Sequence, residues 1–185
     1  MILGDDVWYE IPTLNGGESY STPNIDQLAN DGLSFTQCYA SSNCSPSRFM
    51  LLSGKYNFRN YTQWGVMDRS NRTLGNMFSN AGYKTCYVGK WQLDGGDTFI
   101  TGFGFNNYSL WLPYALNPEE SGDSRYKNPP VYEAGKFLPA GSTNGKYSVD
   151  IFTKYALNFI SKNLQKTLFP VLFNATLPQA FWSYS

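Results

Sequence analysis

The chain has 185 residues, with 14 Lys and Arg against 14 Asp and Glu, three Cys and no His. A net charge of zero argues against nucleic-acid partners, because nothing supplies the excess positive charge that phosphate contacts need. The absence of His excludes a Ser-His-Asp triad, a Cys-His dyad and a His-ligated zinc site within this chain. Any chemistry must therefore use Asp, Lys, Arg, Gln, Ser or Cys side chains.

The length suits one domain or part of a larger one. No run approaches 18 apolar residues, so we expect no membrane span. The first six residues show no basic region followed by an apolar stretch, so no signal peptide is expected in this chain. Aromatic residues make up 17% of the sequence, which suits either core packing or stacking on sugar rings.

Strand and helix signals alternate along the chain. In order, they predict the end of a buried strand at 1–3, a helix at 22–30, a strand at 33–39, a helix at 44–52, a helix at 73–82 and a strand at 85–88. Residues 94–145, rich in Gly, Pro, Asn and Tyr, predict a long irregular insertion. A helix from 147 and a strand at 168–173 follow. This alternation predicts an α/β fold with a mostly parallel sheet flanked by helices.

Polar groups follow three of these strands, at 5–6, 90–92 and 177–179. Ligands of such sheets bind beyond the carboxyl ends of the strands, so the three groups point to one site. Adjacent Asp5 and Asp6 suit calcium or magnesium, although a solvated turn is the alternative. Cys44 opens a helix, where free amide groups favour an anion, and Arg48 lies one turn on. A buried structural Cys is the alternative there.

The segment Cys44-Ser45-Pro46-Ser47-Arg48 resembles the formylglycine motif of the type I sulfatases, of the alkaline-phosphatase-like superfamily. Other blocks agree with that family in order and spacing, at 3–6, 22–29, 51–55, 81–85 and 89–91. The resemblance covers roughly the first 110 residues and resumes at 147–182. It implies that residues 1–185 form the N-terminal part of a sulfatase catalytic domain, with the C-terminal part and subdomain absent.

The resemblance implies a sulfatase that hydrolyses a sulfate ester, we expect of a carbohydrate. Cys44 would be oxidised to formylglycine, whose hydrate attacks sulfur, releases the alcohol and then expels sulfate. The implied catalytic residues are Cys44, Arg48, Lys90 and Gln92. Ser47 is better interpreted as part of the modification motif and the first helical turn than as a nucleophile.

The same resemblance implies a bound divalent cation, typically calcium, with magnesium as the alternative. Its implied ligands are Asp5, Asp6 and the modified Cys44, and the implied substrate contacts are Lys90, Gln92 and Gln179. The implied partners are a sulfated small molecule or glycan and a maturation enzyme, either formylglycine-generating or anaerobic sulfatase-maturating. The full-length protein is expected in the periplasm or outside the cell.

The chain departs from the family pattern where two His are replaced by Gln92 and Gln179. Gln can donate a hydrogen bond to a sulfate oxygen, but it cannot shuttle a proton near neutral pH. The family's second pair of metal ligands also lies downstream of residue 179, beyond this chain. Cys38 and Cys86 are expected to be buried in strands, and a Cys38–Cys44 disulfide would remove the nucleophile.

Three functions therefore stay open at the level of sequence. The first is a sulfatase. The second is a non-catalytic sulfatase-like module that binds anions or glycans, or an inactive fragment, which the Gln substitutions and the absent ligands favour. The third is a related hydrolase of phosphate or phosphonate esters, against which the intact Cys-x-Pro-x-Arg motif argues.

Overall fold

The computed structural model describes residues 1–116, 124–165 and 172–176. Its main sheet has six strands in the order β1-β8-β4-β5-β6-β7, and β2 and β3 form a separate antiparallel pair. The strands are β1 (Ile2–Asp5), β2 (Tyr61–Gln63), β3 (Val66–Met67), β4 (Cys86–Lys90), β5 (Asn107–Trp111), β6 (Tyr132–Glu133), β7 (Lys136–Phe137) and β8 (Leu172–Thr176). The helices are the 3₁₀ helix η1 (Thr13–Asn15), α1 (Pro23–Asp31), α2 (Cys44–Ser53), α3 (Asn57–Asn60), α4 (Leu74–Asn80), α5 (Gly96–Gly102) and α7 (Ser148–Lys162).

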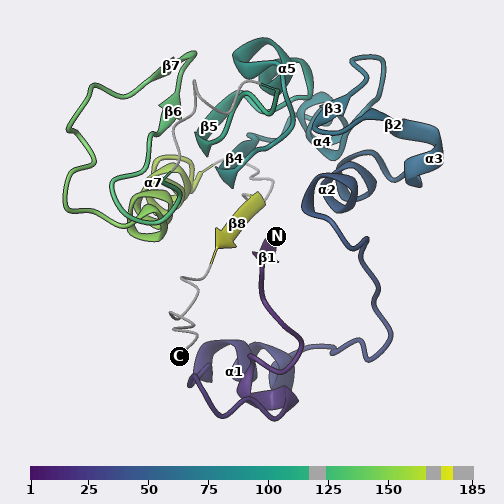
Figure 1. Cartoon of the computed structure of the whole chain (residues 1–185), viewed down its shortest axis with the longest axis vertical. Coiled ribbons are helices and arrows are strands. Elements are labelled where there is room, and N and C mark those ends of the chain that lie inside the picture. Colours follow the sequence, from purple (N-terminus) through teal and green to yellow (C-terminus); the bar gives the residue numbers. More distant parts are fainter. Residues whose placement is uncertain (117–123, 166–171, 177–185) are drawn as a thin grey trace, which may run out of the picture.

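Four neighbouring strands of the main sheet run parallel, and β6 and β7 continue it in antiparallel pairing. This arrangement confirms the predicted α/β class with a mostly parallel sheet. Asp5, the last residue of β1, pairs with Thr176 of β8, and Lys90, the last residue of β4, pairs with Trp111 of β5. The carboxyl ends of these strands therefore meet at one edge of the sheet (Figure 1).

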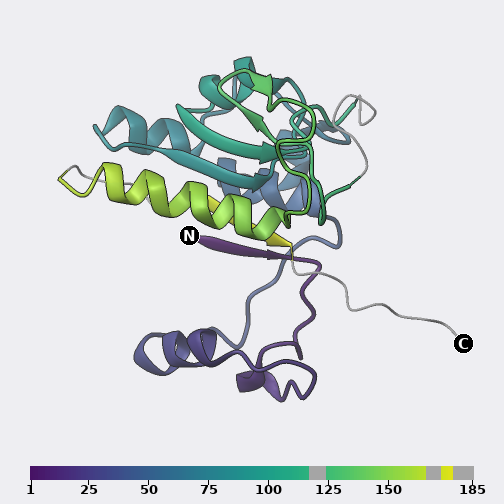
Figure 2. The ribbon, with the colours of Figure 1, turned by 90° about the vertical axis from the view of Figure 1, so that its left-hand side faces the viewer.

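Helices cover both faces of the sheet, and the alternation of side chains along β4 shows how. Tyr87 packs into one apolar cluster with Phe49 and Leu52 of α2, whereas Cys86 and Val88 pack into a second cluster with α7 residues. Successive strand residues point to opposite faces, so β4 lies between the two clusters. Figure 2 shows α7 running along the sheet, whereas α1 and η1 lie away from it.

The helix boundaries follow local capping signals. α2 begins at Cys44 and ends at Gly54, which takes the left-handed conformation that a C-terminal glycine favours. Thr73 caps α4 in a reciprocal capping box with Asn76. The helices predicted at 44–52 and 73–82 are confirmed as α2 and α4, and the helix predicted from 147 is confirmed as α7. No helix in the described ranges combines the length and the apolar character needed to cross a bilayer.

The predicted strand at 33–39 is wrong. Residues 33–43 form neither helix nor strand, and Cys38 is exposed rather than buried. No neighbouring strand pairs with this segment among the described residues, and α1, which precedes it, buries none of its residues and lies away from the sheet (Figures 1 and 2). An alternating pattern cannot form a strand without a partner to complete its hydrogen bonds.

The prediction that 94–145 is an irregular insertion is wrong in part. The segment contains α5, and its strand β5 pairs with β4 along its whole length. β5 has only five residues, interrupted by Asn107 and Ser109, so it lacks the continuous apolar run that marks a buried strand. The last predicted strand, at 168–173, is observed as β8 at Leu172–Thr176, and residues 166–171 lie outside the described residues.

Candidate active site

Asp5 is the centre of a buried ion-pair cluster at the carboxyl edge of the sheet. One carboxylate oxygen accepts from Arg48 Nη2 at 2.9 Å, and the other accepts from Lys90 Nζ at 2.8 Å. All three residues are nearly inaccessible, at 6% exposure for Asp5, 1% for Arg48 and 5% for Lys90. The ends of β1 and β4 and the first turns of α2 thus converge on one carboxylate.

The ionisation of Asp5 follows from this pairing. Burial by itself would raise the pKa of the carboxyl group, but the Arg48 guanidinium and the Lys90 ammonium together outweigh it and hold the pKa below its usual range. Asp5 is therefore a carboxylate at neutral pH. Tyr87, whose hydroxyl donates to the Lys90 carbonyl, has its pKa raised to about 12 by burial and stays protonated.

Cys44 and Gln92 meet at the N-terminus of α2. The Cys44 thiol donates to Gln92 Oε1 at 2.8 Å, and Arg48 Nη1 donates to the same oxygen at 3.1 Å. Cys44 is a partly accessible free thiol, and no disulfide joins it to Cys38. The structure therefore brings Cys44, Arg48, Lys90 and Gln92, all predicted from the sequence as site residues, into one connected group with Asp5.

The backbone of Gln92 is fixed from two sides. Its φ of +52° lies in the left-handed region, which non-glycine residues seldom adopt. Its amide donates to the Leu112 carbonyl at 3.0 Å, and its own carbonyl accepts from the fully buried Ser45 hydroxyl at 3.2 Å. These bonds hold a strained residue where its side chain reaches Cys44 and Arg48.

The hydroxyl of Ser47 lies in the first turn of α2 and bonds to backbone carbonyls. It donates to the carbonyls of Ser41 and Asn43, both at 3.0 Å. This agrees with its interpretation as part of the first helical turn.

Asp6 lies beside this cluster but has a different partner. Its carboxylate pairs with Arg125 Nη2 at 2.9 Å, and its side chain is 41% exposed. Arg125, which sequence reasoning missed, lies within the 94–145 segment, where no local motif distinguishes it from other surface arginines. Arg48 and Lys90 pair with Asp5, and Arg125 pairs with Asp6. These three cations and two carboxylates have a net charge of +1.

The predicted metal ligands supply few of the oxygen donors that a calcium site needs. Asp5 and Asp6 are hard oxygen donors, as calcium and magnesium prefer, but calcium takes six to eight oxygens. The described residues contain no group of three or more His, Cys, Asp and Glu that could hold a metal ion. Both carboxylates are paired with cationic side chains. Gln179, the third predicted substrate contact, lies outside the described residues.

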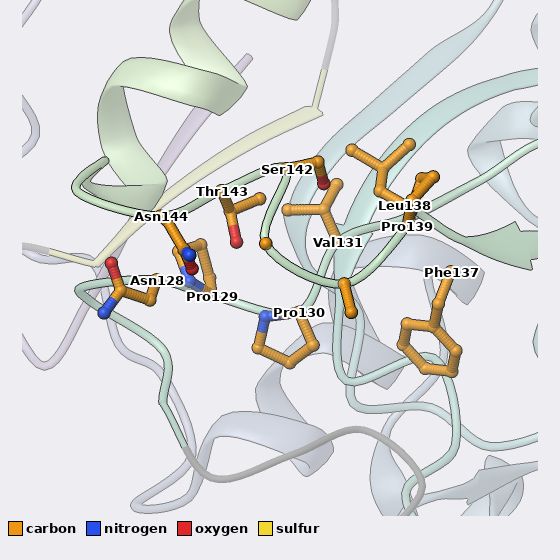
Figure 3. Close-up of a pocket in the computed structure, with 12 residues that line it drawn as sticks. Asn128, Pro129, Pro130, Val131, Phe137, Leu138, Pro139, Ser142, Thr143 and Asn144 are labelled. Carbon is orange, nitrogen blue, oxygen red and sulfur yellow. The ribbon is translucent and has the colours of Figure 1, made fainter.

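A cavity of about 360 Å³ lies elsewhere, between segment 128–131 and loop 137–144 (Figure 3). Prolines, apolar side chains that include Phe137 and Leu138, and the polar side chains of 142–144 and Asn128 line it. It contains none of the buried charges or the thiol described above. The cluster around Asp5 therefore remains the candidate active site.

Comparisons of the whole sequence identify its relatives. A family model described as Sulfatase matches residues 1–177. The chain is 29% identical to the N-acetylglucosamine-6-O-sulfatase of Bacteroides thetaiotaomicron over 98% of its own length. It is 31% identical to arylsulfatase G of Rattus norvegicus over 70% of its length. It covers 30% of the first relative and 26% of the second, so it spans about a third or less of their lengths.

Solved structures show the same fold. One, described as BT4656 in complex with its substrate D-glucosamine-2-N,6-O-disulfate, is 29% identical and superposes with a TM-score of 0.78 over 98% of this chain and 34% of that chain. The crystal structure of Ps i-CgsB gives a TM-score of 0.81 at 22% identity, over 97% of this chain and 45% of that chain. With a family model that matches nearly its whole length, the chain belongs to the sulfatase family.

Proposed function

We propose that the protein hydrolyses a sulfate ester of a carbohydrate, through a formylglycine derived from Cys44 and with a divalent cation at Asp5 and Asp6. The observation that carries this proposal is the position of Arg48, which pairs with Asp5 alongside Lys90 and shares the Gln92 side-chain oxygen with Cys44. Family membership and the similarity to an N-acetylglucosamine-6-O-sulfatase support the substrate class.

The charge of the site suits a sulfuryl group. Arg48 and Lys90 are buried cations on Asp5, and Arg48 shares the Gln92 side-chain oxygen with the thiol of Cys44. Buried charges act more strongly than charges in water. Arg48 Nε has no hydrogen-bond partner among the described residues, so the guanidinium keeps a donor that a bound oxyanion would satisfy. In the transition state, these cations would stabilise the charge that develops on the sulfuryl oxygens.

The N-terminus of α2 adds to this stabilisation. Asn43, which precedes the helix, makes no side-chain hydrogen bond to its first turn. Backbone N–H groups at a helix start have no partner within the helix, and together with the helix dipole they favour an anion. Cys44 is the first residue of α2, so its side chain lies next to the backbone amides that favour an anion.

The donor set fits a divalent cation as part of a larger site. Asp5 and Asp6 would bind it, and the remaining oxygens would come from outside the described residues, as the family pattern implies. When bound, such a cation supplies charge neutralisation at the sulfuryl oxygens. The negative charge of the Asp5 carboxylate would then offset the positive charges of Arg48, Lys90 and the cation together.

Gln92 supports the alternative, a sulfatase-like module that binds sulfated sugars without hydrolysing them. It accepts hydrogen bonds from Cys44 and Arg48, which supports a positioning role, but its amide cannot move a proton near neutral pH. Residual turnover would then depend on Lys90 or on groups outside the described residues. Measurement of sulfate release separates the two functions.

The experiment combines intact mass with turnover. The full-length protein is co-expressed with a formylglycine-generating or anaerobic maturation enzyme, and oxidation of Cys44 lowers the mass by about 18 Da, the difference between a thiol and an aldehyde side chain. Sulfate release from N-acetylglucosamine-6-sulfate is measured alongside. Cys44→Ala should abolish both changes, and Cys38→Ala, at an exposed thiol outside the site, should preserve both. Turnover that persists in Cys44→Ala would refute the assignment.

The remaining expectations belong to the same proposal. The maturation enzyme is the expected protein partner, and the periplasm or the cell exterior is the expected location. Fractionation of cells that express the full-length protein tests the location directly.

A further inference from the structure

The cavity between segment 128–131 and loop 137–144 has the composition of a small-molecule site, and the proposed reaction does not use it. Its volume of about 360 Å³ lies within the range of about 300–1,000 Å³ that is typical of ligand pockets. Phe137 is at one end of the lining and Asn128 at the other, with the hydroxyl-bearing side chains of Ser142 and Thr143 between them (Figure 3). Apolar walls with a few polar groups are the usual make-up of such pockets.

Backbone hydrogen bonds hold the two walls of the cavity together. The Leu138 amide donates to the Val131 carbonyl at 2.8 Å, which joins loop 137–144 to segment 128–131. Just beyond the loop, the Gly145 amide donates to the side-chain oxygen of Asn128 at 2.7 Å. The cavity is therefore formed before any ligand binds, and a ligand does not have to order the loop.

The polar side chains of the loop are available to a ligand. The side chains of Ser142, Thr143 and Asn144 make no hydrogen bond with any other residue that the structure describes. Hydroxyl and amide groups both donate and accept, so these three side chains can match the hydroxyls of a sugar. At the apolar end, the Phe137 ring is held against Tyr132, with ring centroids 5.1 Å apart.

The lining carries no charge, because none of the residues around the cavity is ionisable. Lys146 Nζ donates to the Ser142 carbonyl at 2.8 Å and stabilises the loop, but Lys146 does not line the cavity. A charged group that leaves water without gaining a partner loses free energy. The cavity therefore favours an uncharged ligand, whereas Arg48 and Lys90 make the candidate active site favourable for an anion.

We propose that this cavity is a second carbohydrate site, which binds an uncharged sugar of the N-acetylglucosamine type. The choice of a sugar rests on the proposed function, because hydrolysis of the sulfate ester of such a sugar leaves it uncharged. N-acetylglucosamine combines an apolar methyl group, which suits Leu138, with amide and hydroxyl groups, which suit Thr143 and Asn144.

The test measures sugar binding to full-length protein that carries Cys44→Ala, so that turnover does not interfere. Ligand-observed NMR titrations compare N-acetylglucosamine with N-acetylglucosamine-6-sulfate. For a sugar of about 15 non-hydrogen atoms, we expect a Kd in the millimolar range. Thr143→Val, which removes one hydroxyl and keeps the shape, should weaken binding of N-acetylglucosamine about 3- to 10-fold. Ala140→Trp, which fills the cavity from its loop, should abolish that binding.

Neither variant should change the affinity for N-acetylglucosamine-6-sulfate by more than about twofold, because its sulfate directs it to the candidate active site. Thr98→Val is the matched control, since Thr98 is an exposed threonine of α5 that does not line the cavity. It should leave both affinities unchanged. Thermal unfolding of each variant shows whether the fold is retained, and Thr143→Val tests the site if Ala140→Trp does not fold.

Four results would overturn the proposal: no binding of N-acetylglucosamine by the parent protein, undiminished binding in Ala140→Trp, an equal loss in Thr98→Val, or equal losses for the two sugars. Sulfate release by protein with Cys44 intact separates this inference from the proposed function. Release combined with any of those results would retain hydrolysis and refute the second site. Absence of release, together with N-acetylglucosamine binding that Ala140→Trp removes, would refute hydrolysis and retain the second site.

Discussion

The adjacent carboxylates Asp5 and Asp6 should differ sharply in what they contribute to stability. Asp5→Asn removes the carboxylate that balances two buried cations, whereas Asp6→Asn removes one side of a single, partly exposed ion pair. The two substitutions are isosteric and lie one residue apart. A difference in stability between the two variants therefore reflects burial and ion pairing, and not position in the chain.

The magnitude follows from the distances. At 2.9 and 2.8 Å, each contact of Asp5 is worth roughly 6 kcal/mol of gross attraction with an effective dielectric constant of about 20. Desolvation of three charged groups offsets much of this, and removal of one partner from a buried pair costs about 3–5 kcal/mol. Exposed pairs contribute about 0–1 kcal/mol, which is the expectation for Asp6→Asn.

Urea denaturation of the full-length protein at pH 7, with a chelator present to exclude divalent cations, measures both free energies of unfolding. Asp5→Asn should shift the midpoint strongly and Asp6→Asn weakly, without a change in the denaturant slope. If the two variants lost the same free energy, the argument that Arg48 and Lys90 depend on Asp5 for their burial would be wrong.

Two further predictions concern pH and packing. Because the pKa of Asp5 is lower in the folded state, its stabilising contribution is fully present above the unfolded value of about 3.9 and is lost as pH falls from there through the folded pKa. Acid titration of stability below about pH 4 should therefore be steeper for the parent protein than for Asp5→Asn, and parallel curves would contradict this. Gly104→Ala should destabilise the protein by at least about 2 kcal/mol more than Gly145→Ala. Both glycines have a positive φ, so backbone strain affects both substitutions. A Cβ at 104 would lie 2.3 Å from the Gly75 backbone, whereas a Cβ at 145 would meet nothing within 4 Å. Chemical denaturation of the two variants checks it, and equal losses would mean that α4 shifts to accommodate the methyl group.

The parts of the site that the sequence predicts are those whose signals are local. A cysteine at a helix start, an arginine one turn on, and polar residues after apolar strands can be recognised without knowledge of the fold. The carboxyl ends of parallel strands then bring Asp5 and Lys90 together, although 85 residues separate them.

The remainder depends on contacts that no local pattern encodes. Arg125 reaches Asp6 because residues 126–128 bond to the start of α7, and nothing in its immediate sequence indicates that partner. The left-handed backbone of Gln92 likewise depends on Ser45 and Leu112, which lie 47 and 20 residues away along the chain. Pairing of β5 with β4 was missed for the same reason, because its polar positions are tolerated only once it is part of the sheet.

Gln92→His tests whether proton transfer is the function that this site lacks. Histidine tolerates the left-handed region better than most residues, so the φ of +52° does not oppose the change. A neutral imidazole can accept from Cys44 or Arg48 as the amide does, and its unperturbed pKa of about 6.5 permits proton transfer near neutral pH. General acid–base catalysis contributes roughly 10²- to 10⁴-fold, so kcat for sulfate release should rise by at least tenfold, with a new ionisation near pH 6–7 in its pH profile. Gln92→Asn, which retains an amide without a titrating group, should show neither change. A rise in kcat without the new ionisation would mean that histidine acts by repositioning Arg48, and proton transfer would then have to come from Lys90 or from residues outside the described ranges.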